Sequence, residues 1–338
     1  MSLTIRDVAS YVGVSVSTVS KAMNDSPEIT DETKHRVLKA VKELKYVPND
    51  SARKLKSRFT KRIAFVAHLE EEGAFTNPHL FEIISAAARY VDKKGYCFCL
   101  VNQHGDNVDK IGHLILQKSF DGFLVHASSF SKAMYKLFGG SNVPYVIIGK
   151  PLIDGEKLSW VDNNNEICGA MAAKHLVDIG RKNIAFIGGE KYDDISESRY
   201  KGVCSYLKSV KMELAHSFHL RGQSTFEDGA YMASKLLKRQ QADGIICANN
   251  TIALGVLNYL KTRVSIPKDI AIVSFDKHPF SQITSPRMTV VDIDMDELGR
   301  QAAEKLLFKI THPEKENSPC IIKPYLLVRE STISSNKR

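Results

Sequence analysis

The chain has 338 residues, of which 43% are hydrophobic and 25% are charged, and its formal net charge is +9. These values are ordinary for a soluble globular protein, and a chain of this length is expected to form two or more domains. We find neither a run of about 18 apolar residues that could span a membrane nor the basic and apolar start of a secretory signal, so we expect a cytoplasmic protein without membrane contact.

The positive charge is concentrated near the N-terminus. Residues 1–62 contain thirteen Lys and Arg against seven Asp and Glu, a net charge of +6. Such a segment favours a polyanionic partner, because each phosphate that it neutralises releases condensed counterions. The alternative is an ordinary solvated surface, which runs of charge commonly form.

A short helix is predicted at the start of this basic segment. Thr4 and Asp7 fit a capping box, in which the two side chains satisfy unpaired backbone amides where a helix begins. The helix should run to about Val12, and Gly13 supplies a tight turn after it.

A second short helix follows, and it is the candidate for contacting DNA. Ser15 caps it, and Val19 and Met23 lie four residues apart on its inward face. Two short helices joined by a turn with glycine form a helix-turn-helix. The outward side of the second helix fits the major groove, and it consists of Val16, Ser17, Ser20, Lys21 and Asn24. The alternative for this side is a solvated, serine-rich surface.

A third helix should complete a small core. Thr30 caps it, and its apolar stripe consists of Val37, Leu38, Val41 and Leu44. The sequence Tyr-Val-Pro-Asn at 46–49 ends this helix, because proline excludes helical geometry at the residue before it.

Asn49 is predicted to cap a further helical segment of about eight residues, from Asp50 to about Lys56. A helix this short is marginal in water, so we expect it to become ordered on DNA. Leu55 could then wedge into a minor-groove step where two copies meet, with Arg53 and Lys56 near phosphates. The alternative is a frayed linker.

From about residue 61 the pattern changes to strands that alternate with helices. Apolar runs suited to buried parallel strands lie at 62–67, 96–101, 122–126, 145–148, 184–188, 244–247 and 270–275. Their number suits two similar halves, and open α/β sheets bind ligands outside the carboxyl ends of their strands. We therefore expect an α/β core of two parallel-sheet subdomains with a ligand cleft between them.

Several polar residues follow strand ends and are candidates for this cleft. The set is His68, Lys150, Arg199, Asn249 and Asp276, with Phe75 and Ser196 as further candidates. An Arg opposite a carboxylate can hold neighbouring sugar hydroxyls through forked, charge-assisted hydrogen bonds. The alternative for Arg199 and Asp276 is a buried structural ion pair.

No motif points to catalysis, a metal or a cofactor. The six cysteines lack zinc-site spacing and are expected to be reduced core residues. We find no phosphate loop, no zinc-protease motif and no nucleophile elbow, so we expect no enzyme. A sugar receptor that never contacts DNA is the other rival, and the basic N-terminal segment argues against it.

The residues at 4–57 closely resemble the headpiece and hinge of the lactose/galactose repressor family: TIRDVASYVGVSVSTVSKAMNDSPEITDETKHRVLKAVKELKYVPNDSARKLKS. Later segments resemble the core of that family in the same order: HLVDIGRKNIAFIGG, SRYKG, IPKDIAIVSFD and SPRMTVVDIDMDELGR. The resemblance implies a bacterial repressor that binds a near-palindromic operator as a homodimer and responds to a small ligand. It implies a core like that of periplasmic sugar-binding proteins.

The resemblance also implies roles for individual residues. Val16, Ser17 and Lys21 match base-contacting positions, and Leu55 matches the minor-groove lever. The full set of expected DNA-binding residues is Thr4, Ser15, Val16, Ser17, Thr18, Ser20, Lys21, Asn24, Tyr46, Arg53, Leu55 and Lys56. Arg199, Asn249 and Asp276 match effector-binding positions.

The effector is less well defined by this comparison. Asn164 and Asn250 stand where the family usually has Asp, and Ser224 stands where several members carry an aromatic residue. The stretch from 146 to 165 looks like the maltose-operon regulators, which favours an α-glucoside. The ligand acts either as an inducer, which weakens operator binding, or as a corepressor, as in the purine branch of the family.

The expected domains follow from these assignments. The headpiece covers 1–48, the hinge 49–60, the core 61–330 and a tail 331–338. Within the core, one subdomain comprises 61–160 and 292–318, and the other 161–291 and 319–330. The resemblance places the chain crossings between them near 159–164, 284–292 and 315–319.

Overall fold

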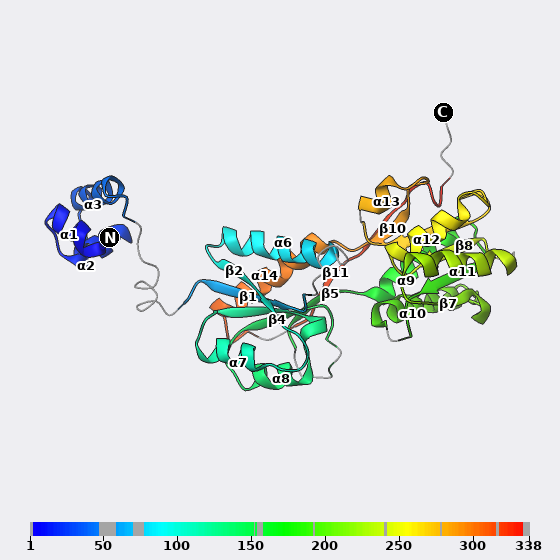
Figure 1. The fold of residues 1–338 in the computed structure, drawn as a ribbon, viewed down its shortest axis with the longest axis horizontal. Helices are drawn as coiled ribbons and strands as arrows, with labels where there is room; N and C mark the ends of the chain where they lie inside the picture. Colours follow the sequence, from blue (N-terminus) through cyan, green and yellow to red (C-terminus); the bar gives the residue numbers. More distant parts are fainter. Residues whose placement is uncertain are drawn as a thin grey trace, which may run out of the picture. The chain divides into compact units, whose positions relative to one another are not determined.

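A computed structural model describes residues 3–46, 59–69, 78–151, 153, 158–191, 193–239, 242–277, 279–315 and 318–333. The chain divides into two compact units (Figure 1). The first comprises residues 1–62 with 118–121, and the second comprises the remainder.

The first unit contains the three predicted helices, α1 (Ile5–Val12), α2 (Val16–Met23) and α3 (Asp31–Glu43). Gly13 ends α1 in a left-handed conformation with φ 72°, which the tight turn to α2 requires. The side chains of Ser15 and Thr30 cap α2 and α3 by accepting backbone N–H groups, as predicted.

Val8, Val19 and Val37 are fully buried and form the centre of the headpiece core. Met23 packs against this core as a partly buried residue, as expected for the inward face of α2, and Ala22 is buried on the same helix. One expectation about the composition of the core is wrong. On α3, Leu38 is 46% exposed, because the residue after the buried Val37 is rotated about 100° around the helix.

The first sheet of the second unit has the strand order β11-β5-β4-β3-β1-β2 (Figure 1). Its strands are β1 (Arg62–Ala67), β2 (Cys97–Asn102), β3 (Gly122–His126), β4 (Tyr145–Ile148), β5 (Trp160–Asn163) and β11 (Cys320–Ile322). Helices α6 (Pro78–Lys93) and α14 (Met295–Thr311) cover one face, and α7 (Asp109–Leu116) and α8 (Lys132–Gly139) cover the other.

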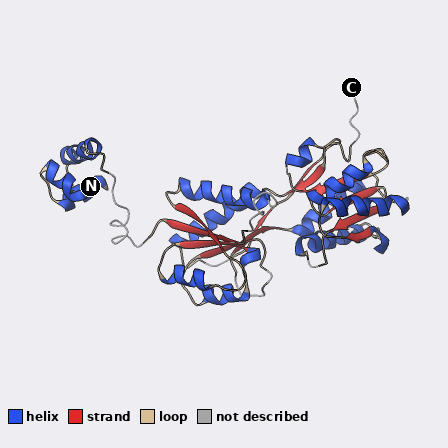
Figure 2. Ribbon diagram, viewed as in Figure 1, coloured by secondary structure: helices blue, strands red, loops and turns tan. Residues whose placement is uncertain are grey.

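The second sheet has the order β12-β10-β9-β8-β6-β7, and Figure 2 shows the strands gathered into these two sheets. Its strands are β6 (Ile184–Gly188), β7 (His219–Arg221), β8 (Gly244–Cys247), β9 (Ala271–Phe275), β10 (Thr289–Asp292) and β12 (Tyr325–Leu327). Its helices are α9 (Asn165–Asp178), α10 (Asp194–Ser209), α11 (Phe226–Arg239), α12 (Asn250–Leu260) and α13 (Pro279–Ile283). The sheet is parallel except for the antiparallel pair β10–β12.

The chain crosses between the two sheets three times. The first two crossings follow β5 and β10, within or next to the expected ranges. The third lies at 323–324 rather than at 315–319, because Cys320–Ile322 pairs with β5 in the first sheet. Residues 320–322 therefore belong to the first subdomain and not to the second.

The helices α9 and α10 approach each other unusually closely. A Cβ atom on Gly169 would lie 1.9 Å from the Arg199 carbonyl oxygen, and one on Gly202 would lie 1.9 Å from that of Glu166. Glycine is required at both positions, and the contact places Arg199 beside the start of α9.

The cysteines only partly follow the expectation of core residues. Cys168 and Cys247 are buried, and Cys99, Cys204 and Cys320 are half-buried. Cys97 is exposed on β2, which is an edge strand of the first sheet.

Candidate functional site

The outward side of α2 presents a mixed polar and apolar surface. Val16 is 40% exposed, and Ser17, Lys21 and Asn24 are exposed as expected, whereas Ser20 is half-buried. Ser15 accepts the backbone N–H of Thr18 at 3.1 Å, and its hydroxyl lies 2.8 Å from that of Thr18. The hydroxyls of Ser15 and Thr18 thus hold the start of the helix.

Lys21 and Asn24, both predicted to contact DNA, also have partners within the headpiece. Lys21 forms an ion pair with Glu28, and the Asn24 amide donates a hydrogen bond of 2.9 Å to the Ser20 carbonyl oxygen. Both residues are exposed, so DNA would compete with these contacts rather than be blocked by burial.

Thr4 and Asp7 cap α1. The Asp7 carboxylate accepts the Thr4 backbone N–H at 2.7 Å and the Thr4 hydroxyl at 2.8 Å. These hydrogen bonds lower the pKa of Asp7, so the cap persists at neutral pH. Tyr46, expected to contact DNA, is only 8% exposed and packs in the headpiece core instead.

Four predicted residues lie outside the described part of the chain. They are Arg53, Leu55 and Lys56 of the hinge, and Phe75 of the cleft.

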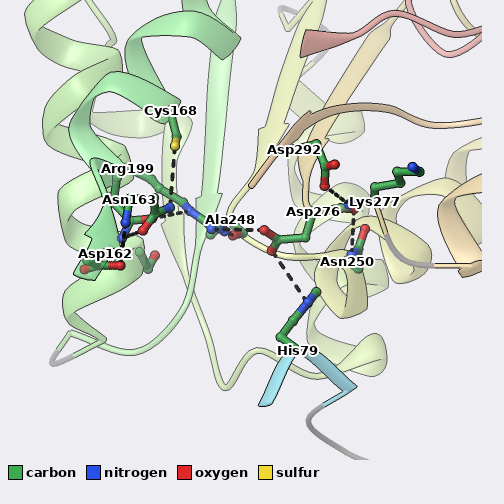
Figure 3. Close-up of polar contacts among 12 residues, drawn as sticks. His79, Asp162, Asn163, Cys168, Arg199, Ala248, Asn250, Asp276, Lys277 and Asp292 are labelled. Carbon is green, nitrogen blue, oxygen red and sulfur yellow. Dashed lines mark hydrogen bonds and ion pairs between the residues drawn. The ribbon is translucent and has the colours of Figure 1, made fainter. Parts of the chain in front are cut away.

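Arg199 is the centre of a buried polar cluster in the second unit, shown in Figure 3. Its Nε donates to Asn165 Oδ1 at 3.0 Å, and its Nη1 donates to the Ala248 carbonyl oxygen at 2.6 Å. The guanidinium lies 4.2 Å from the centre of the Phe275 ring. These contacts fix the orientation of the guanidinium, leaving Nη2 directed at Asp276.

Asp276 follows β9 with φ 68° and is 6% exposed. Its Oδ1 lies 3.6 Å from Arg199 Nη2, and its Oδ2 lies 3.7 Å from His79 Nε2 on α6. Oδ1 is buried and accepts no hydrogen bond. The pair is thus electrostatic, and the carboxylate retains unused acceptor capacity, which is unusual for a buried polar group.

A cavity of about 200 Å³ lies beside this carboxylate. Its walls come from both subdomains: His79, Glu82, Asp276, Lys277, Asp292, Ile293, Asp294, Met295, Asp296 and Tyr325. Asp292 accepts the Lys277 backbone N–H at 2.6 Å and the Tyr325 hydroxyl. Burial and this hydroxyl contact raise the pKa of Tyr325, so it stays a hydrogen-bond donor.

Among the predicted cleft residues that the structure describes, Asp276 alone lines this cavity, and Arg199 contacts Asp276 without lining it. Ser196 is buried and accepts the Gly189 backbone N–H at 2.9 Å. Asn249 accepts the Ile252 N–H at 2.9 Å as the cap of α12. Both contacts support local structure.

His68 and Lys150 lie at strand ends of the first sheet, as expected. His68 Nδ1 lies 3.0 Å from His104 Nδ1, so the two rings can share one proton. The Lys150 backbone N–H donates to Asp162 at 2.8 Å, and the residue is exposed.

Several residues of this region were not predicted from the sequence: His79, Glu82, Asp162, Asp292 and Tyr325. Asp162 lies at the end of β5, and burial raises its pKa despite two backbone N–H donors. Asp162 and Asp292 each lie at the end of a strand of only four residues, and these short strands gave no clear apolar signal.

Two family models match the chain. The model of bacterial regulatory proteins of the lacI family matches residues 4–49, and a periplasmic binding protein-like domain matches residues 173–332. Among the described residues, no helix is long and apolar enough to cross a membrane.

Relatives resemble the chain over nearly its whole length. The HTH-type transcriptional repressor PurR of Glaesserella parasuis is 30% identical over 99% of both chains, and that of Mannheimia succiniciproducens is 31% identical over 97% of this chain and 98% of its own. A transcriptional regulator CelR–cellobiose complex has a TM-score of 0.70 at 27% identity, covering 97% of this chain and 99% of its own. The lac repressor dimer bound to operator shares the fold, with a TM-score of 0.80 at 20% identity over 99% of this chain and 100% of its own.

Proposed function

The chain belongs to the lacI family of bacterial regulatory proteins, and on that premise we propose that it is controlled by a sugar that binds at Arg199 and Asp276. As a member of this family it is a helix-turn-helix transcriptional repressor with a ligand-binding domain. Relatives of this kind are repressors rather than enzymes.

The proposed ligand site at Asp276 is supported by one main observation. The buried Asp276 carboxylate has an oxygen without a hydrogen-bond donor, and the residue lines a cavity with walls from both subdomains. A buried carboxylate left without donors is costly, so a ligand that supplies hydroxyl donors here gains binding free energy. Arg199, held in place by three other contacts, lies 3.6 Å behind this carboxylate and would fix its charge and position.

A sugar is the class that fits these groups. Adjacent hydroxyls can donate to Asp276 and accept from Arg199 in the same ring. The related regulator in complex with cellobiose is consistent with a glucoside ligand. We propose a glucoside of the α series, from the resemblance to maltose-operon regulators.

We propose that ligand binding changes operator affinity by changing the arrangement of the two subdomains. We propose a homodimer on a near-palindromic operator, with the headpiece at 1–48 and the hinge at 49–60 contributed twice. Asp276 belongs to the second subdomain and His79 to the first, so a ligand between them changes which arrangement of the subdomains is favoured. A tenfold change in operator affinity requires about 1.4 kcal/mol of differential binding.

The test is a titration of the full-length protein with operator DNA in the presence of mono- and disaccharides, followed by fluorescence anisotropy. We expect an α-glucoside to shift operator affinity, and Asp276→Asn to lose that shift. Asp106→Asn, at an exposed loop position, removes the same charge and should keep it. A shift that persists in Asp276→Asn would contradict the proposed site.

A further inference from the structure

Cys97 and Cys99 form a pair of thiols on the edge strand β2. The two residues lie two positions apart on the strand, so their side chains leave the same face of the first sheet. Their sulfur atoms are 4.0 Å apart. Cys97 is exposed, Cys99 is half-buried and neither forms a disulfide, so the pair is accessible from solvent.

The other four cysteines are placed differently. Cys168 and Cys247 are buried, and burial raises the pKa of both thiols, that of Cys168 to about 11. A buried thiol that keeps its proton is neither a nucleophile nor a metal ligand. Cys204 and Cys320 are half-buried and pack against the cores of different subdomains. The pair on β2 is therefore the place in this chain where two thiols can act together.

The strand geometry favours binding of a metal ion over formation of a disulfide. Residues two apart on a strand have Cα atoms roughly 6.6–6.8 Å apart, which is the upper end of the range that a disulfide spans. Oxidation would require β2 to bend away from its pairing with β1. A metal ion needs no such movement, because sulfurs 4.0 Å apart subtend an angle of about 120° at an ion that is about 2.3 Å from each.

The number and kind of ligands select the metal. Within the described ranges, no group of three or more His, Cys, Asp or Glu side chains could hold a metal ion. A structural zinc site is closed by four ligands, so two sulfurs leave zinc half-coordinated. Hard ions such as Mg²⁺ and Mn²⁺ prefer carboxylate and carbonyl oxygens. Copper(I) is a soft ion that thiolates select, and two or three ligands are sufficient for it.

We propose that Cys97 and Cys99 together bind one soft monovalent metal ion of the copper(I) type. Both sulfurs bind as thiolates, the two thiol protons pass to solvent, and neither the metal nor the sulfur changes its oxidation state. Neither cysteine lines the cavity beside Asp276, so this metal site is separate from the proposed ligand site.

The experiment titrates the full-length protein with copper(I) under anaerobic conditions, in competition with the coloured copper(I) chelator bicinchoninate. We expect one ion per chain. Cys97→Ser and Cys99→Ser should each weaken binding at least about tenfold, because a single thiolate cannot chelate the ion. The double variant should lose little more than either single variant, because the two sulfurs act as one coupled unit.

Cys204→Ser and Cys320→Ser are the matched controls. Each removes one half-buried thiol that lies apart from β2, on α10 and β11, and each should leave the affinity for copper(I) unchanged. Thermal unfolding establishes that every variant is folded under the conditions of the titration. Equimolar zinc or manganese(II) should not displace copper(I) from the unsubstituted protein.

The proposal is overturned if copper(I) stays with bicinchoninate at every protein concentration, or if Cys204→Ser weakens binding as much as Cys97→Ser does. A loss in Cys97→Ser with no loss in Cys99→Ser would show a single reactive thiol and would refute the pair. Displacement of copper(I) by equimolar zinc would refute the preference for a soft monovalent ion.

Discussion

Lys21, at the centre of the predicted DNA-contacting surface, forms an ion pair with Glu28 of the same headpiece. Their side chains are 49% and 66% exposed, so the pair lies at the surface. A surface pair of this kind is worth about 0–1 kcal/mol, and DNA can displace Glu28 at that cost. We therefore expect Glu28 to compete with the operator for Lys21.

Glu28→Gln should raise operator affinity about twofold to fivefold, because Lys21 no longer has to exchange one carboxylate for a phosphate or a base. The measurement is fluorescence anisotropy at one fixed salt concentration. Glu32→Gln, in the first turn of α3, makes the same change in headpiece charge. Equal gains from both variants would show that overall charge, and not the pair with Lys21, sets the effect.

Lys21→Ala should weaken operator binding and reduce the slope of log affinity against log salt by about one unit if Lys21 contacts a phosphate. If it contacts a base instead, the salt slope stays and discrimination between operator variants falls by about 1–3 kcal/mol. Unchanged affinity, slope and discrimination would remove Lys21 from the contact surface.

Arg199→Ala should abolish the response of operator binding to ligand. It also leaves the buried Asp276 carboxylate and the Ala248 carbonyl oxygen without their partner, which should lower the free energy of unfolding by about 3–5 kcal/mol. Thermal unfolding of the variant establishes the temperature at which it is folded, and the ligand titration is made below that temperature. A folded Arg199→Ala protein that responds normally would show that Arg199 is not part of the ligand site.

The place of Asp276 in the buried polar cluster was predictable from the sequence because it lies next to a strong local pattern, whereas Arg199 lies within α10 and not at a strand end. Asp276 directly follows the apolar run at 271–275, and strand ends of a parallel sheet share one edge. His79 and Tyr325 carry no such pattern. They reach the cavity through the packing of α6 and the antiparallel strand β12, which only the tertiary structure provides.

Which helical residues are buried was likewise only partly predictable from the sequence. Ser15, Thr30 and Gly13 were predictable because caps and turns depend on neighbouring residues. The choice between Met23 and Ala22, or between Leu38 and Ala40, depends on how closely the helices approach each other. The small residue is buried in both cases, since three short helices in contact leave little room between them.

Gly169→Ala should weaken both stability and the ligand response. The added Cβ would lie 1.9 Å from the Arg199 carbonyl oxygen, so α9 and α10 must move apart and carry Arg199 with them. Overpacking of this kind costs about 1–3 kcal/mol. Gly139→Ala, at the end of α8 where a Cβ meets nothing within 4 Å, is the matched control for thermal unfolding and calorimetry. Equal melting temperatures of the two variants would contradict the close helix contact.

Leu55→Ala should reduce specific operator affinity by at least about tenfold while ligand affinity stays unchanged. The basis is the predicted hinge segment, in which one leucine from each copy enters a minor-groove step. Calorimetry with ligand and anisotropy with operator separate the two properties. Operator binding equal to that of the unsubstituted protein would refute the wedge.

The protonation of His219 should make the stability of the folded protein depend on pH. Its ring stacks on Tyr200 at 3.7 Å, and its Nε2 accepts a hydrogen bond from Arg221 Nε at 3.3 Å, which only the neutral ring can do. Burial, with Arg221 and His216 nearby, lowers the pKa of His219 from 6.5 to about 4. The unfolded chain thus takes up this proton at a higher pH than the folded one. The contribution of neutral His219 to the free energy of unfolding is therefore complete above pH 6.5 and is lost as the pH falls toward 4.

His219→Gln should remove part of the fall in melting temperature between pH 6.5 and pH 4. His113→Gln, at an exposed position of α7, should leave this fall unchanged. A melting curve of His219→Gln with the pH dependence of the unsubstituted protein would show that other groups set its acid stability.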